Sequence, residues 1–353
     1  MTPVPACTIV SNNYLALARV LAESYREQHP GARVFACVVD RPHPSVDYAA
    51  LPFETVFAEE LGIEGFAGLA FSYGILELNT AVKPYLLEFL RERRGLSRVF
   101  YLDPDILVLD RLAALEAALE RGPMVLTPHI TAPLDDARQP SERLILLSGA
   151  YNLGFVGLRL DASTAPFLRW WQERLRRFCL HDVEHGLFVD QSWMDLAPSF
   201  LPDVQIARDP VFNVAYWNLA HRRPEFADGR WRIEGRPLGF FHFSGLPLDD
   251  LERVSRYQDR IRLGQRPELR PLFEDYARRL SAAGHDELRA LPYAWARFAD
   301  GRPVPDVARR VRQRVDPLGA RWADPFAIRR ERVGGGHAGG GRESWHPGRD
   351  GCR

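Results

Sequence analysis

The chain contains the stretch Val99-Phe100-Tyr101-Leu102-Asp103-Pro104-Asp105-Ile106-Leu107-Val108-Leu109, in which two carboxylates interrupt an apolar run typical of a buried strand. Alternate residues of an extended chain point to the same side, so Asp103 and Asp105 are expected to converge at the end of that strand. Two buried like charges repel each other unless one is protonated or a cation lies between them. Oxygen ligands of this kind suit Mg²⁺ or Mn²⁺, and the stretch therefore predicts a metal-dependent enzyme.

An ordinary turn is the alternative for the same residues, because Asp and Pro together are common in turns. Asp103 would then cap the turn, and Asp105 would be solvated at a strand edge. The apolar residues on both sides favour the buried site.

Composition limits the kinds of partner. The 353 residues, 46% of them hydrophobic, are enough for a large core in one big domain or two smaller ones. Basic and acidic residues balance at 46 each, which argues against nucleic acid or an anionic membrane as the principal partner. Lys83 is the only lysine.

The cysteines and the N-terminal segment indicate a compartment. Cys7, Cys37, Cys179 and Cys352 are far apart and show no paired metal-ligand spacing, so reduced thiols are expected. Residues 1–6 lack a basic segment followed by an apolar core, and no stretch of ~18 uncharged apolar residues occurs. The expectation is a soluble cytoplasmic enzyme.

The first forty residues predict a strand, helix, strand unit. A strand is expected over 7–10, a helix over 14–28 and a second strand over 33–39. Such a unit implies a parallel pair with a right-handed crossover. Ligands bind at the carboxyl ends of such strands, which here hold Ser11, Asn12, Asn13 and Asp40.

Alternating strands and helices continue to about residue 245 and predict one α/β domain with a mainly parallel mixed sheet between helices. The pattern indicates helices at 85–94, 112–120 and 165–178, and strands at 98–102, 123–127, 152–158 and 238–243. Residues 129–143 suit a loop over the site. The expected divisions are a catalytic domain over 1–250, a helical, Arg-rich segment over 251–328 and a disordered Gly/Arg-rich tail over 329–353.

Over roughly residues 7–245, an ordered set of motifs resembles the nucleotide-sugar-dependent glycosyltransferases of the A-type (GT-A) fold, and among these the retaining family 8 group. The motifs are Thr8-Ile9-Val10-Ser11-Asn12-Asn13-Tyr14, Ala81-Val82-Lys83-Pro84-Tyr85, Tyr101-Leu102-Asp103-Pro104-Asp105, Tyr151-Asn152-Leu153-Gly154-Phe155, Val189-Asp190-Gln191-Ser192 and Phe241-His242-Phe243-Ser244-Gly245.

The resemblance implies that Asp103, Asp105 and His242 bind Mn²⁺ or Mg²⁺ on the donor diphosphate. An imidazole among oxygen ligands points more toward Mn²⁺. A core histidine is the alternative for His242, although strand alternation turns it away from Phe241 and Phe243.

The resemblance also implies roles around the donor. Lys83 would contact the donor phosphate or sugar, with a solvated lysine at a helix start as the alternative. Residues 11–14 would contact the base and ribose, although Asn12 or Asn13 could equally be a helix N-cap. Asn152 and Gly154 would lie near the donor sugar, where the glycine lets the backbone approach the ligand.

Asp190 and Gln191 would face the reacting carbon of the sugar. The alternative is an Asp N-cap followed by an incidental Gln. In retaining transfer the group on the back face is either a nucleophile or an electrostatic stabiliser, and the sequence leaves both open.

Two departures from the family pattern concern the donor. Asn12-Asn13 stands where members often have an Asp near the base, and Leu246-Pro247-Leu248 replaces the lysine-containing close after Gly245. The phosphate contact and the nucleoside are therefore open.

The resulting hypothesis is transfer of a sugar, with retention, from a nucleoside diphosphate donor, expected to be UDP-linked, to a glycan, lipid-linked or small-molecule acceptor. A Mg²⁺-dependent phosphohydrolase of the haloacid dehalogenase type is one alternative, but that chemistry needs a lysine downstream of the acids. A catalytically idle sugar-nucleotide-binding protein is another.

Several other residues have two interpretations. Aromatic side chains either stack on acceptor sugars or belong to the core, with the core favoured; these are Trp193, Tyr216, Trp217 and Trp231. Residues 293–298 either close one side of the acceptor site or mediate dimerisation. The arginines of the helical segment would suit peripheral contact with anionic lipid.

Overall fold

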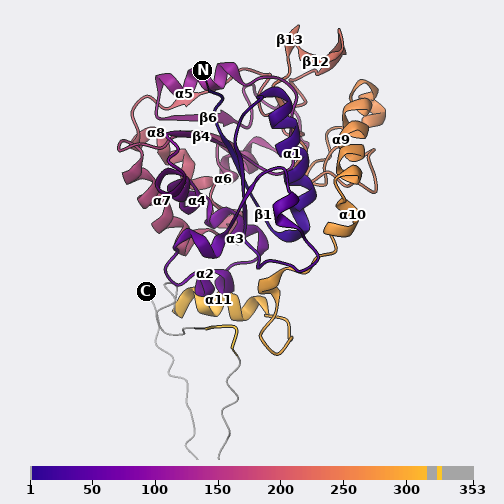
Figure 1. The fold of residues 1–353 in the computed structure, drawn as a ribbon. Helices are drawn as coiled ribbons and strands as arrows, with labels where there is room; N and C mark the ends of the chain where they lie inside the picture. Colours follow the sequence, from indigo (N-terminus) through magenta and orange to yellow (C-terminus); the bar gives the residue numbers. More distant parts are fainter. Residues whose placement is uncertain (1, 316–323, 328–353) are drawn as a thin grey trace, which may run out of the picture.

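A mainly parallel sheet with helices on both faces forms the centre of the molecule (Figure 1). The structure is a computed structural model that describes residues 2–315 and 324–327. The tail predicted over 329–353, which includes Cys352, lies outside the described residues. Cys7, Cys37 and Cys179 are free, buried thiols.

The sheet has seven strands in the order β10-β6-β7-β4-β1-β2-β3. All of its adjacent pairs are parallel except the two made by β7, which runs antiparallel to β4 and β6. The predicted α/β fold with a mainly parallel mixed sheet is thus confirmed. The strands are β1 (Ala6–Val10), β2 (Val34–Val38), β3 (Glu54–Phe57), β4 (Arg98–Leu102), β6 (Met124–Pro128), β7 (Tyr151–Arg159) and β10 (Gln205–Ile206).

Helices cover both faces of the sheet because its central strands are apolar on both sides. In β4, Phe100 and Leu102 belong to one core cluster, whereas Val99 and Tyr101 belong to the other. The first cluster packs under α1 (Leu15–Gln28), α5 (Ala113–Arg121) and α9 (Arg270–Ala282). The second lies under α2 (Phe66–Ser72), α3 (Ile75–Ala81), α4 (Lys83–Arg94) and α7 (Ala165–Phe178).

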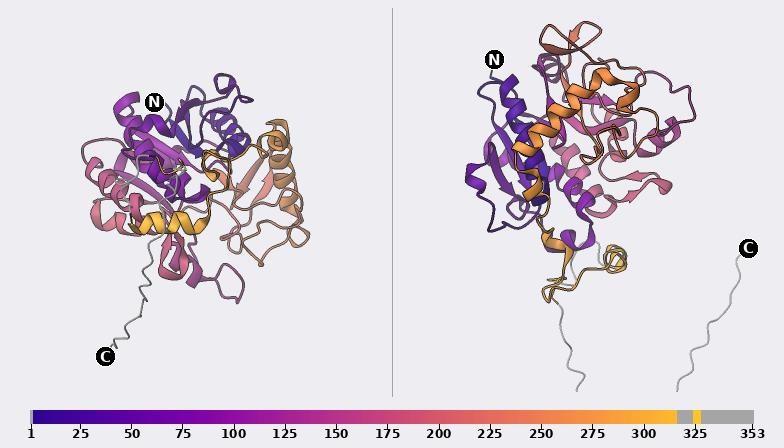
Figure 2. Two further views of the ribbon diagram at one scale, coloured as in Figure 1. Left: turned by 90° about the horizontal axis from the view of Figure 1, so that it is seen from below. Right: turned by 90° about the vertical axis from the view of Figure 1, so that its right-hand side faces the viewer.

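The chain after residue 250 packs back onto the first strands and helices. The Tyr276 ring on α9 stacks on Phe243, with ring centroids 3.9 Å apart. α9 and α10 (His285–Leu288) lie beside α1, and α11 (Asp306–Val315) contacts α2 (Figures 1 and 2). Residues 251–269, expected to be helical, form only the short 3₁₀ turns Leu263–Gln265 and Pro267–Leu269.

The two acids lie in a turn after the strand predicted over 98–102, and not in the extended chain from which their convergence was argued. β4 ends at Leu102, and a turn closed by the Ile106 N–H donating to the Asp103 carbonyl (3.2 Å) carries the acids. Pro104 has no N–H and a fixed φ, which favours this turn over an extended chain. β5 (Ile106–Val108) then leaves the main sheet and pairs with β14 (Phe240–His242).

The remaining elements are short. They are α6 (Glu142–Ser148), α8 (Ala197–Phe200), β8 (His181–Asp182), β9 (Leu187–Phe188), β11 (Glu225–Ala227), β12 (Arg230–Ile233) and β13 (Arg236–Pro237). Among the described residues, no helix combines the length and the apolarity needed to cross a membrane.

Candidate metal centre

Polar residues gather at one edge of the main sheet because the parallel strands end there. Residues 11–13 follow β1, Asp40 follows β2, and the two acids follow β4. β7 runs the opposite way, so its first residues, including Asn152, lie at the same edge. The topology thus brings these parts of the chain together.

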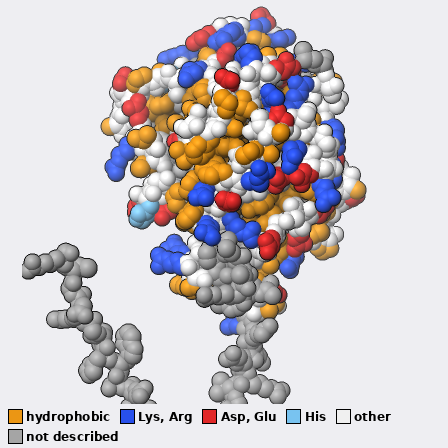
Figure 3. Space-filling view, turned by 90° about the vertical axis from the view of Figure 1, so that its left-hand side faces the viewer, with side chains coloured by type: hydrophobic (Ala, Val, Ile, Leu, Met, Phe, Trp, Pro, Cys, Tyr) orange, Lys and Arg blue, Asp and Glu red, His pale blue; other side chains and the backbone are white. Residues whose placement is uncertain are grey.

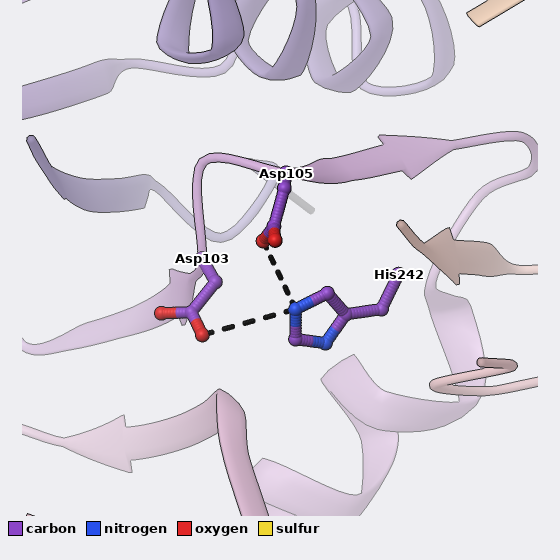
Figure 4. A group of neighbouring side chains, drawn as sticks. All are labelled: Asp103, Asp105 and His242. Carbon is purple, nitrogen blue, oxygen red and sulfur yellow. Dashed lines mark ion pairs between the residues drawn. The ribbon is translucent and has the colours of Figure 1, made fainter. Parts of the chain in front are cut away.

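Asp103, Asp105 and His242 form a group able to hold a metal ion (Figure 4). One ligand atom from each lies within 4.8 Å of the others. The His242 Nε2 atom is 2.9 Å from Asp105 Oδ1 and 3.9 Å from Asp103 Oδ2. The carboxylates are 31% and 23% exposed, whereas the His242 side chain is 3% exposed, so a ligand reaches the group from the carboxylate side.

Strand pairing brings the histidine to the acids. In the antiparallel register of β5 and β14, His242 lies opposite Ile106, and the Phe243 N–H donates to the Asp105 carbonyl (2.9 Å). The Asp103 N–H donates to the Gly154 carbonyl of β7 (2.8 Å), which ties the turn to the main sheet. Phe241 and Phe243 belong to the core cluster beside α1 and α9.

The electrostatics of the group suit a cation. Burial raises the pKa of Asp103, although the positive charges of Lys83 and His242 oppose the rise. Burial lowers the pKa of His242, but Asp105 and Asp103 raise it more, so the net shift is upward. The two carboxylates thus favour positive charge beside them. A proton on the imidazole supplies that charge, or a divalent ion supplies it when the imidazole is neutral and acts as a ligand. The donor set of two carboxylates and one imidazole fits Mn²⁺ or Mg²⁺.

Lys83 and Asp190 form a buried ion pair next to the acids. The Lys83 Nζ atom is 2.5 Å from Asp190 Oδ2, and the two side chains are only 1% and 2% exposed. Nζ also donates to the Leu153 carbonyl (3.1 Å) and lies 4.0 Å from the centroid of the Tyr101 ring. The solvated lysine considered for position 83 is therefore wrong, because this side chain is enclosed by protein.

Asp190 is held close enough to Asp103 for the two charges to interact. Burial raises the pKa of Asp190, the Lys83 ammonium lowers it, and Asp103 raises it again. Val189, directly before Asp190, has φ +44°, which is a strained backbone for a β-branched residue. In addition, Tyr101 donates its hydroxyl to Asp103 Oδ1 (2.7 Å), a contact that the sequence analysis missed.

Gln191 is occupied at both ends of its amide. Its Oε1 accepts from the Leu153 N–H (3.0 Å) and from Asn152 Nδ2 (3.3 Å). Its Nε2 donates to the Ser148 carbonyl (2.8 Å). Gln191 therefore ties α6 to β7 and holds Asn152 in place.

Gly154 provides space for the histidine. A Cβ atom at this position would lie 2.4 Å from His242 Cε1 and 2.7 Å from Asn152 Oδ1, closer than real Cβ contacts. The resemblance had suggested that this glycine lets the backbone approach a ligand. The group it admits in the structure is the imidazole of His242.

The residues after β1 and β2 bind one another. The Asn12 N–H donates to Asp40 Oδ2 (2.8 Å), and Asn12 Oδ1 accepts from the Tyr48 hydroxyl (2.8 Å). Ser11 Oγ donates to Asn13 Oδ1 (2.6 Å). Neither asparagine side chain caps a helix. Beyond this network, Tyr14 remains 44% exposed at the edge of the site.

Residues 293–298 lie against the end of β2. The Ala294 N–H donates to Asp40 Oδ1 (2.8 Å), and Trp295 Nε1 donates to the Val39 carbonyl (2.8 Å). This segment thus covers the part of the sheet edge where Asp40 and Asn12 lie.

The buried loop that carries Asn213 and Trp217 packs against the metal group, and the sequence analysis did not single out Asn213. Asn213 Nδ2 donates to Thr127 Oγ1 (2.8 Å) and to Asn152 Oδ1 (3.0 Å). The ring of Trp217 stands nearly perpendicular to His242, with centroids 5.2 Å apart. The signal available in the sequence was an amide, Asn213, isolated within an apolar run.

The four aromatic residues left open by the sequence differ in position. Trp217 is buried in the core, and Tyr216 packs half-buried between Trp217 and Tyr257. Trp231 is half-buried against Phe226.

Trp193 is half-buried in an aromatic cluster with Trp170 and Phe178. Both partners belong to α7, on the side of the molecule shown in Figure 3, where hydrophobic side chains gather between charged ones.

Comparison with known proteins gives distant similarities. No family model matches the chain. The uncharacterized protein YfnF of Bacillus subtilis (strain 168) is 27% identical over 190 residues, which cover 51% of this chain and 60% of YfnF. The uncharacterized protein YfnD of the same strain is 26% identical over 150 residues, 42% of this chain and 46% of YfnD. The chain therefore spans less than two thirds of either relative.

Among solved structures, the galactosyltransferase LgtC in complex with donor and acceptor sugar analogs has 17% identity and a TM-score of 0.46, covering 83% of this chain and 99% of LgtC. The glycosyltransferase GlyE of Streptococcus pneumoniae TIGR4 has 14% identity and a TM-score of 0.49, covering 84% of this chain and 67% of GlyE. Because these identities and TM-scores are low, the function has to be argued from the chemistry of the site itself.

Proposed function

We propose that this chain is a metal-dependent glycosyltransferase that moves a sugar, with retention of configuration, from a nucleoside diphosphate donor to an acceptor. One observation carries the proposal. Asp103, Asp105 and His242 converge at the carboxyl edge of the sheet beside the buried Lys83–Asp190 pair.

The metal group would hold the donor by its diphosphate. Asp103, Asp105 and His242 supply two oxygen ligands and one nitrogen ligand, and both carboxylates remain partly exposed. A divalent ion held there supplies positive charge to the diphosphate as it leaves the sugar. Because His242 has a packed ring and a fixed register, the ligands are already placed before the donor binds.

Asp190 is the residue that we expect to act on the anomeric carbon of the donor sugar. Its carboxylate is enclosed by protein and held by Lys83, so water does not screen its charge. In one route this carboxylate would displace the nucleoside diphosphate from the anomeric carbon, and the acceptor hydroxyl would then displace the carboxylate, so that two inversions retain configuration. In the other route it would stabilise positive charge on the anomeric carbon while the acceptor attacks from the face that the diphosphate leaves, which also retains configuration. Lys83 and Gln191 act as positioning residues in this proposal, since Lys83 binds Asp190 and Gln191 binds the strand that carries Asn152.

The donor's nucleoside would lie over the ends of β1 and β2. Asn12 and Asp40 shape this region, and Ser11, Asn13 and the exposed Tyr14 ring border it. Asn152 and Gly154 would place the sugar between the metal group and Asp190. We assign UDP as the expected nucleotide and a glycan, lipid-linked or small-molecule compound as the acceptor on the resemblance of the motifs.

The test is release of nucleotide from a panel of nucleotide sugars with Mn²⁺, with EDTA and in Asp105→Asn. Glu120→Gln is the matched control, because it also changes an acid to its amide. Glu120 pairs with Arg98, at the end of β4 that lies away from the metal group. The proposal expects Mn²⁺-dependent release that EDTA and Asp105→Asn abolish and Glu120→Gln retains.

Three results would contradict the proposal. Phosphate release from phosphate esters, with no use of any nucleotide sugar, would indicate a phosphohydrolase. Binding of a nucleotide sugar without turnover across an acceptor panel would indicate a binding protein. An inverted anomeric configuration in the product, read by proton NMR, would contradict retention alone.

A further inference from the structure

A donor diphosphate bound beside the metal group would suit a further cationic side chain. A diphosphate spreads negative charge over two phosphates, and proteins commonly pair a metal ion with Arg or Lys there. Lys83, the only lysine, is buried against Asp190. No lysine follows Gly245. Lysine is thus excluded, and a permanently charged side chain for this contact would be an arginine at the rim of the site.

The chain returns to the site at Gly245. This glycine has φ +69°, and its carbonyl accepts from the Arg256 N–H (3.0 Å). A Cβ on Gly245 would lie 2.5 Å from the Tyr257 ring and 2.9 Å from Ser255 Oγ. Only a glycine lets residues 255–257 pack this closely beside a turn that begins three residues after His242.

Arg256 holds its charge without an acidic partner. Its Nε atom is 3.5 Å from the Gly245 carbonyl, and its guanidinium carbon is 5.9 Å from the centroid of the Tyr257 ring. Within the part of the chain that the structure describes, no carboxylate lies at ion-pair distance from it. By contrast, Arg260 pairs with Asp136 in the same region, and Arg270 pairs with Glu252. The side chain of Arg256 is exposed.

Ring contacts lead from Arg256 toward the metal group. The ring of Tyr257 lies 6.3 Å from that of Tyr216, which lies 4.9 Å from Trp217. The ring of Trp217 in turn lies 5.2 Å from His242. Burial raises the pKa of the Tyr14 hydroxyl, Asp105 and Tyr257 raise it further, and Arg256 lowers it. Burial also raises the pKa of the Tyr216 hydroxyl, and Tyr257 and Asp105 raise it further. Three aromatic rings, those of Tyr257, Tyr216 and Trp217, thus lie between the Arg256 guanidinium and His242.

We infer that Arg256 binds the second phosphate of the donor diphosphate, alongside an ion that Asp103, Asp105 and His242 would hold. The planar guanidinium presents N–H groups that match phosphate oxygens, and Gly245 and Tyr257 limit the directions in which it points. The inference rests on the proposed function and gives this chain a phosphate contact in place of the missing lysine.

Binding measurements test it without turnover. The full chain is titrated with UDP, GDP, ADP and CDP, and with the matching monophosphates, in the presence of Mn²⁺. Arg256→Gln is expected to weaken binding of the preferred diphosphate at least about tenfold, and binding of its monophosphate less than about twofold. Arg256→Lys should be intermediate, because a point charge replaces the planar fork.

Arg253→Gln is the matched control, since it removes an exposed arginine from the same segment. It should bind like the wild type. Binding of Mn²⁺ alone, measured by electron paramagnetic resonance, should be unchanged in all the variants, and so should their melting temperatures.

The outcomes separate the two proposals. Equal diphosphate binding by wild type and Arg256→Gln would overturn the role of Arg256 and leave the proposed function standing. Equal losses for the diphosphate and the monophosphate would also overturn it, because the contact would then not be to the second phosphate. A wild type that binds no nucleoside diphosphate with Mn²⁺ would overturn both.

Discussion

The Nε2 atom of His242 lies 2.9 Å from Oδ1 of Asp105, although the histidine ends β14 and the aspartate follows β4. The contact exists because β5 and β14 pair outside the main sheet, in a register that puts His242 opposite Ile106. A one-residue slip of this pairing would turn His242 to the side of Phe241 and Phe243, into the core. The metal group thus depends on the register of a two-stranded sheet.

The space around His242 gives a first prediction. Gly154→Ala would place a Cβ atom 2.4 Å from His242 Cε1, so the imidazole must move away from the acids. We expect Mn²⁺ affinity to fall about 10–100-fold, the usual loss when a group that orients a metal ligand is removed. The far-ultraviolet circular dichroism spectrum of the variant should match that of the wild type. Gly74→Ala is the control, because its added Cβ meets only Glu77 Oε2 at 3.8 Å. Unchanged Mn²⁺ affinity in Gly154→Ala would show that the ring does not need this space.

The buried pair gives a second prediction. Lys83→Met leaves the Asp190 carboxylate buried without its partner, which should cost about 3–5 kcal/mol in the free energy of unfolding. Asp190→Asn leaves the ammonium unpaired and should cost a similar amount. In the double variant neither charge remains, so its loss should be well below the sum of the two single losses. Urea unfolding of the four proteins measures this, and strict additivity would argue against the pair.

Activity should respond differently from stability. If Asp190 acts at the anomeric carbon, the double variant regains stability but no turnover. Recovery of turnover in Lys83→Met/Asp190→Asn would limit Asp190 to a structural role.

The packing of Trp217 gives a third prediction. Its ring stands nearly perpendicular to both His242 and His129, with centroids 5.2 and 5.3 Å away. Trp217→Leu should lower stability by about 2–4 kcal/mol and weaken Mn²⁺ binding several-fold, because the imidazole of His242 loses a wall. Trp193→Leu, in the half-buried surface cluster, should leave Mn²⁺ binding as it is. Equal Mn²⁺ binding by both variants would separate Trp217 from the metal group.

His129 gives a pH prediction. Burial lowers its pKa from 6.5 to about 4, so the folded protein keeps this imidazole neutral where the unfolded chain protonates it. The free energy of unfolding should therefore fall as the pH drops from about 6.5 toward 4, by up to about 3 kcal/mol from this group. Above pH 7 the group contributes no pH dependence, because it is neutral in both states.

Comparison of wild type with His129→Gln isolates that contribution. The variant should lose less stability than the wild type between pH 7 and pH 4.5 in urea unfolding. Identical pH profiles would mean that His129 is protonated equally in both states.

Local pattern was enough for several features of the fold. The strand at 98–102 and the helix at 165–178 agree with β4 and α7 residue for residue, because each has a clear apolar period. The path after Leu102 was not predicted, since an apolar run does not show where a strand leaves its sheet. Residues 251–269, the first part of the segment expected to be helical, form only short 3₁₀ turns, and Gly264 and Pro267 lie in those turns.

By itself, the sequence determined the alternation of strands and helices, the mainly parallel sheet, and the presence of two acids in an apolar run. These follow from periods and residue types within a few positions of one another. Only the tertiary structure decided that Lys83 is buried against Asp190, that Gly154 makes room for His242, and that Arg256 returns to Gly245 with its charge unpaired. Such contacts join distant segments, and they depend on strand register and on which side chains packing removes from water, which no local period encodes.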